Sequence, residues 1–114
     1  MIAVIFEVEP VAEHKQAYLE IAARLRADLE KIDGFISVER FQSLANPEKM
    51  LSLSFFRDET AVRHWRNLAS HRAAQDAGRG GLFAGYRLRV AEVLRDYGLS
   101  ERDAAPADSR AIHG

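Results

Sequence analysis

Within the first third of the chain, the spacing between apolar residues changes from every second position to every third or fourth position. From Ile2 to Glu9, apolar and β-branched residues alternate so that one face is fully apolar, which is typical of a β-strand. From Val11 to Ile32, apolar residues recur at spacings of three and four on a charged background, which is typical of an amphipathic helix. The pattern therefore predicts a strand, a helix that starts near Pro10, and a break at Asp33-Gly34.

The middle of the chain predicts two further strands. Alternating residues run from Phe35 to Leu44 and again from Lys49 to Arg57. The Asn-Pro pair between them marks a turn, and so short a connection implies that the two strands are antiparallel. Along the second of these strands, one face carries Leu51, Leu53 and Phe55 and the other carries Met50, Ser52, Ser54 and Phe56.

The remaining elements are predicted from caps, glycines and composition. Asp58 is placed to cap a second helix over residues 59–68, and Ser70 to cap a further helical segment over residues 71–77. Glycines at positions 78, 80 and 81 end that segment, and alternation resumes from Ala84 to Asp96. Residues 99–114 are rich in Ala, Asp and Ser and are predicted to form a polar tail, which leaves one domain over residues 1–98.

The predicted order is β-α-β-β-α-β, an α+β fold of the ferredoxin-like type, with a four-stranded antiparallel sheet and both helices on one face. Some apolar residues must then lie on the helix-free face, which a monomer would leave exposed. We therefore expect a homodimer in which two copies bury this face against each other by two-fold symmetry. The candidates for the face are Phe35, Phe41, Met50, Phe56, Tyr86, Leu88 and Val90, with Phe41, Phe56 and Tyr86 as the foremost members.

Composition and charge exclude several function classes. The formal net charge of -1 argues against a nucleic-acid or anionic-membrane surface. The absence of Cys excludes disulfides, a thiolate nucleophile and cysteine-ligated metal, and the four His residues lack the spacing of a metal site. The chain has no apolar run of membrane-spanning length, and its N-terminus lacks the basic segment of a secretion signal. We expect a cytoplasmic protein whose partners are a second copy and a small molecule.

The stretch HWRNLASHRAAQDAGR, residues 64–79, holds the candidate chemistry. Trp65 shares a helix side with Val62 and Ala69, so it either packs in the core or lines a pocket against a planar substrate. His71 follows a predicted break in the helix. It is either a surface or capping residue or a general base, since His titrates near neutrality.

Three stretches are distinctive when taken with the order of elements: FRDETAVRHWRN, SHRAAQDAGR and YRLRVAEVLRDYG. Together they resemble the antibiotic biosynthesis monooxygenase family, within the dimeric α/β-barrel superfamily. The resemblance covers residues 1 to about 98. It implies a dimer whose two sheets pack face to face as a barrel, with a pocket in each protomer between its sheet and its helices.

The family includes cofactor-independent oxygenases of polycyclic phenols, which place a Trp on the second helix at the pocket. Resemblance to this branch implies a phenol- or quinol-like aromatic substrate. The catalytic candidates are Trp65 and His71, and the candidates for substrate contact are Trp65, Asn67 and Tyr86. We therefore expect a monooxygenase that uses no flavin, haem or metal.

The family also includes haem-degrading enzymes, which this chain resembles less. That branch implies an axial His about three helical turns after the Trp, where this chain has Gln75. It also implies an Asn on the first strand, which here carries Glu7 and no Asn. The alternative to an oxygenase is a non-catalytic or stress-related small-molecule-binding protein of the same fold.

Overall fold

The computed structural model confirms the predicted order of strands and helices. It describes residues 1–68, 76 and 78–114. The four strands are β1 (Ile2–Pro10), β2 (Phe35–Gln42), β3 (Met50–Phe56) and β4 (Phe83–Glu92). They form a sheet in the order β2-β3-β1-β4, in which every neighbouring pair is antiparallel.

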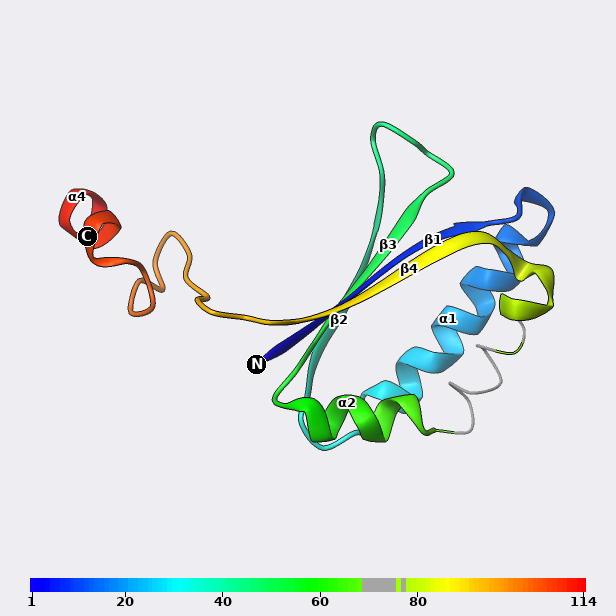
Figure 1. Cartoon of the computed structure of the whole chain (residues 1–114), viewed down its shortest axis with the longest axis horizontal. Helices are drawn as coiled ribbons and strands as arrows, with labels where there is room; N and C mark the ends of the chain where they lie inside the picture. Colours follow the sequence, from blue (N-terminus) through cyan, green and yellow to red (C-terminus); the bar gives the residue numbers. More distant parts are fainter. Residues whose placement is uncertain (69–75, 77) are drawn as a thin grey trace.

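Helix α1 spans Lys15–Leu29, follows a 3-10 turn at Ala12–His14, and lies along one face of the sheet (Figure 1). Its predicted apolar stripe is confirmed, because Tyr18, Ala22 and Leu29 are all buried. Charged residues occupy the side of the helix that faces solvent.

Helix α2 spans Glu59–Arg66 and covers another part of the same face (Figure 1). Its predicted cap is confirmed: the Asp58 carboxylate accepts a hydrogen bond from the backbone N–H of Ala61 at 2.9 Å. Ala61 also packs against the turn that leads into β2. Gly34 in that turn has a φ of +91°, and a Cβ built on it would lie 2.9 Å from the Ala61 Cβ, so glycine is required there.

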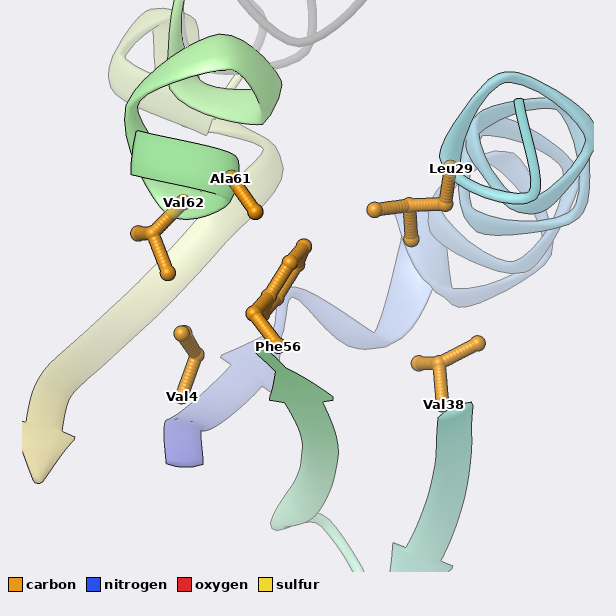
Figure 2. Packing of buried hydrophobic residues seen from close by; sticks show 6 residues of the cluster. All are labelled: Val4, Leu29, Val38, Phe56, Ala61 and Val62. Atoms are coloured by element: carbon orange, nitrogen blue, oxygen red, sulfur yellow. The ribbon is translucent and has the colours of Figure 1, made fainter. Parts of the chain in front are cut away.

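The core under the helices consists of two clusters. The first joins β1, β2 and β3 to both helices, and its buried members are Val4, Leu29, Val38, Phe56, Ala61 and Val62 (Figure 2). Phe56 lies among the others and has no exposed surface. The second cluster lies towards the other end of β1, and its buried members are Val8, Tyr18 and Leu82. The two clusters leave the middle of the covered face to other side chains.

The helix-free face carries a different apolar set from the predicted one. The prediction that Phe56 and Tyr86 lie there is wrong, because Phe56 is buried under the helices and Tyr86 pairs with Val8 on the covered side. Phe41 does lie on the helix-free face, in register with Leu51. The large apolar residues of this face that lie in cross-strand register are Ile5, Phe41, Leu51, Leu53 and Phe55. The other candidates lie on the covered side: Phe35, Met50, Leu88 and Val90.

The difference has two physical causes. Alternation along a strand shows which residues share a face, but not which face the helices cover. In addition, an irregularity between Phe35 and Ser37 shifts the register of β2 against β3. Phe35 therefore joins Val38 on the covered side.

Residues 99–114, predicted as a polar tail, include a short helix, α4 (Ala107–His113), that lies beyond the end of the sheet (Figure 1). The guanidinium of Arg102 organises this segment through three hydrogen bonds. Its acceptors are the carbonyl oxygens of Gly98 and Gly114 and the hydroxyl of Ser109, at 3.2, 2.8 and 2.7 Å. The same guanidinium lies 5.2 Å from the centroid of the Tyr97 ring. The tail is thus polar in composition but has a defined structure of its own.

Phe56→Ala should remove the side chain on which both helices pack. We expect the free energy of unfolding to fall by about 3–5 kcal/mol, the range for deleting a buried Phe side chain. Leu99→Ala is the control, because Leu99 is 99% exposed and its loss should change stability by less than about 0.5 kcal/mol. Chemical denaturation measures both variants, and equal losses would contradict the central place of Phe56.

Asp58→Ala should weaken the first turn of α2. Hydrogen bonding to the Ala61 N–H, and then to Arg57, lowers the pKa of the Asp58 carboxyl. A carboxyl with a lowered folded-state pKa stabilises the protein above its ordinary pKa, and this effect is lost as the pH falls through the folded value. We therefore expect thermal melts to show a lower Tm for the variant at neutral pH and a difference that shrinks in acid. A difference that stays constant with pH would argue against the capping carboxylate as its cause.

Candidate active site

The middle of the covered face carries polar side chains. One row in cross-strand register consists of Arg40 on β2, Ser52 on β3, Phe6 on β1 and Leu88 on β4. We call these four residues the central row. Ser54, two residues along β3, is also polar and is only 4% exposed. Polar groups on the covered side of a sheet cost free energy unless they are hydrogen-bonded, so Arg40, Ser52 and Ser54 mark a place suited to polar contacts.

Arg40 reaches from β2 to the underside of α1. Its Nη2 donates a hydrogen bond to the backbone carbonyl oxygen of Ala22 at 3.0 Å. Its Nε is buried and donates to no acceptor within the part of the chain that the structure describes. Burial raises the pKa of the neighbouring Tyr18 hydroxyl, and the positive charge of Arg40 opposes part of that rise. Arg40 and Tyr18 thus form a polar pair between α1 and the sheet.

Trp65 lies on α2 at the first core cluster. Its ring is inclined by 30° to that of Phe56, with 5.6 Å between the two centroids. The residue is half-buried. Packing against Phe56 is therefore one role of Trp65.

Tyr86 lies towards the opposite end of the covered face. It pairs with Val8, whereas the cluster around Trp65 lies at Ile2 of the same strand, which is about 20 Å away along β1. The Tyr86 ring lies 5.8 Å from that of Phe6, and 56% of the residue is exposed. Trp65 and Tyr86 therefore lie apart, on either side of the central row along the direction of the strands.

Asn67 and His71 complete the set of predicted site residues. Asn67 follows the last turn of α2 and is exposed. Its side-chain amide donates a hydrogen bond to the carbonyl oxygen of Arg63 at 3.0 Å, so this contact caps its own helix. His71 lies outside the described residues, as does most of the helical segment predicted over residues 71–77.

A cleft of about 230 Å³ opens between α2 and β4. Its lining residues are Glu59, Val62, Arg63, Arg66 and Val90. Leu88 and Val90 are 47% and 50% exposed although they lie on the covered side of the sheet. Solvent therefore reaches the covered face along β4.

Sequence reasoning missed Arg40, Ser52 and Ser54 as site residues. The two serines alternate with leucines along β3, a pattern that normally places serines in solvent. The available signal was that the other face of β3 is wholly apolar. If the apolar set faces a second copy, the serines must lie under the helices.

The described part of the chain has neither a metal-binding cluster nor a membrane-spanning helix. Residues 1–68, 76 and 78–114 contain no group of three or more His, Asp or Glu side chains placed to hold a metal ion. No helix formed by those residues is long and apolar enough to cross a membrane.

The chain is similar to known proteins over most of its length. The family model for antibiotic biosynthesis monooxygenase matches residues 1–77. A jasmonate monooxygenase of Pyricularia oryzae is 48% identical over 93 residues, which are 82% of this chain and 43% of that protein. The chain thus spans less than half the length of that relative. The uncharacterised protein YqjZ of Bacillus subtilis is 31% identical over 84 residues, which are 74% of this chain and 72% of that protein.

Solved structures share the fold. A protein of Deinococcus radiodurans, provisionally assigned as an antibiotic biosynthesis monooxygenase, superposes with a TM-score of 0.77 at 15% identity and covers 86% of this chain and 97% of that one. Rv0793 of Mycobacterium tuberculosis superposes with a TM-score of 0.76 at 15% identity, over 85% of this chain and 98% of that one. At these identities the likeness shows the fold alone.

Proposed function

Because the chain belongs to the antibiotic biosynthesis monooxygenase family, we propose that it is a monooxygenase that holds a small cyclic substrate on the covered face of its sheet. The observation that carries this proposal is the central row, which is polar at Arg40 and Ser52 and apolar at Phe6 and Leu88, on a face open to solvent along β4. Trp65 and Tyr86 lie on either side of it. Aromatic walls suit a planar apolar molecule, and a few polar groups fix its orientation.

The proposed reaction uses no flavin, haem or metal. An electron-rich phenol or quinol that has lost a proton reacts with dioxygen itself. One oxygen atom becomes a carbonyl of the quinone product, and the other leaves as water, whose two hydrogens come from the substrate. In this proposal His71 is the base, and Trp65, Asn67 and Tyr86 contact the substrate. The protein contributes the base and a site from which water is excluded.

Two substrate classes have support. The family resemblance favours a phenol- or quinol-like aromatic molecule. The relative named for jasmonate, at 48% identity, favours a lipophilic acid that contains a small ring. A substrate of either class would lie with its apolar ring against aromatic side chains and its polar group against Arg40 and Ser52 of the central row.

A second candidate function is binding without catalysis. It is favoured by the packing of Trp65 against Phe56, since a Trp committed to the core contributes less to a pocket. The same covered face would then bind a small molecule and leave it unchanged.

The oxygenase is tested with a quinol-like phenol and isotopically labelled dioxygen. We expect chelator-treated protein to form a quinone that contains one labelled oxygen atom. Trp65→Phe, which keeps an aromatic ring against Phe56, should lower kcat/KM by about ten-fold, and Arg24→Met on the exposed side of α1 should leave it unchanged. Turnover that appears only after haem, flavin or metal is added would contradict a cofactor-independent reaction. Binding without turnover would favour the second candidate.

We also propose that the helix-free face is buried against a second copy of this chain. Its centre is the apolar set defined above. On the same face, the Glu7 carboxylate forms two ion pairs: its Oε2 lies 3.4 Å from Lys49 Nζ, and its Oε1 lies 3.0 Å from Arg89 Nη1. Hydrogen bonding to Lys49 is the main cause that lowers the pKa of Glu7. An apolar centre with charges of both signs around it can complement a rotated copy of itself, as a two-fold interface requires.

Leu53→Arg should dissociate the proposed dimer, because it puts a charge in the centre of the helix-free face. Leu44→Arg is the control, since Leu44 lies fully exposed in the turn between β2 and β3. Sedimentation velocity at micromolar concentration should give a dimer for the wild type and the control and a monomer for Leu53→Arg. A monomeric wild type would refute the proposal.

A further inference from the structure

We infer that Arg40 binds the anionic head group of the substrate, and that the substrate is therefore a small lipophilic carboxylic acid. This inference rests on the proposed function and chooses between its two substrate classes. Its basis is that the Arg40 guanidinium lies beside the Tyr18 hydroxyl under α1, and that Ser52, the cross-strand neighbour of Arg40, adds a second hydroxyl to the same face of the sheet.

Arg40 has no ion-pair partner among residues 1–68, 76 and 78–114. The cations that do form ion pairs there are Arg26, Lys49, Arg57 and Arg89. Glu39, the chain neighbour of Arg40, lies opposite Leu53 and so belongs to the helix-free face. A partly buried cation without a counter-ion costs free energy, and an anionic ligand removes that cost.

The hydrogen bonds of Arg40 leave part of its guanidinium unused. Nη2 donates to the Ala22 carbonyl at 3.0 Å, which fixes the group under α1. Nε is buried and has no acceptor in the described part of the chain. A carboxylate accepts two parallel N–H hydrogen bonds from one guanidinium, so a small turn of the Arg40 head group on binding would satisfy Nε as well.

Two hydroxyl groups lie on the same side of the sheet as this guanidinium. Tyr18 approaches it from α1 and hydrogen-bonds with it, and Ser52 is the cross-strand neighbour of Arg40. Burial raises the pKa of Tyr18, so its hydroxyl stays protonated at neutral pH and can donate to an anion. One cation and two hydroxyl donors together suit a carboxylate better than a neutral carbonyl.

The rest of the central row suits an apolar body. Beyond Ser52 the row continues through Phe6 to Leu88, which is half-exposed at the open edge along β4. Four neighbouring strands place the two ends of the row about 14 Å apart. A molecule with its acid group at Arg40 and its carbon skeleton over Phe6 would match the length of the row. Jasmonate, for which a relative is named, is such an acid.

The test compares an acid with its methyl ester. Jasmonic acid and methyl jasmonate are the probes, because they share a carbon skeleton and differ in head-group charge. Calorimetric titration of the wild type should give an affinity for the acid about 10- to 100-fold above that for the ester. Arg40→Met should remove this preference by weakening acid binding alone. Arg40→Lys, which keeps the charge and loses the planar fork, should retain only part of it.

Arg24→Met is the matched control, since it removes the same charge from the exposed side of α1 and should leave the preference unchanged. The preference is the ratio of the affinities for acid and ester, both measured on the same protein sample. Partial unfolding of a variant lowers the number of binding sites in that sample but leaves this ratio unchanged. The inference is overturned if the wild type binds neither probe, binds both equally, or keeps its preference in Arg40→Met. If the acid binds through Arg40 and neither acid nor phenol is oxidised, the inference stands and the oxygenase proposal fails.

Discussion

The burial of Phe56 fixes the position of both helices on the sheet. Its side chain shares one cluster with Leu29 of α1 and Val62 of α2, and its ring lies against Trp65. With eight residues, α2 is too short to be stable alone, so apolar burial against Phe56 has to hold it in place. A close-packed cluster resists displacement, and the orientation of Trp65 therefore depends on a core residue that has no exposed surface.

Local patterns were enough to predict the four strands and the helices α1 and α2, but not the short helix α4. They also did not show the side of the sheet to which each residue belongs. The Asp58 cap and the apolar stripe of α1 depend on neighbours close in sequence, and both are confirmed. The faces depend on where the helices lie, which alternation does not record. Phe35 shows the second difficulty, because the irregular register at the start of β2 places it with Val38 on the covered side.

Of the residues that the sequence proposed for the site, the structure places the two aromatic ones in relation to the covered face. Trp65 and Tyr86 are large amphipathic side chains, and the structure places both on the covered side, at opposite ends. Arg40 and Ser52 could not be found from their own pattern, because a polar residue in a strand has the same periodicity whether it faces solvent or a ligand. The contact between Arg40 and the Ala22 carbonyl of α1 is what separates the two cases, and that contact joins residues far apart in the chain.

Serine and apolar residues alternate along β3, and this alternation produces both the polar site and the apolar helix-free face. Ser52 and Ser54 take positions under the helices that would otherwise extend the core, so the core divides into two clusters. The apolar residues that alternate with them, Leu53 and Phe55, lie on the helix-free face. There they add little stability to a monomer, because apolar burial contributes only when water is removed from both sides of a contact. In the proposed dimer the second copy supplies that burial and so offsets the free energy that a polar inner face costs.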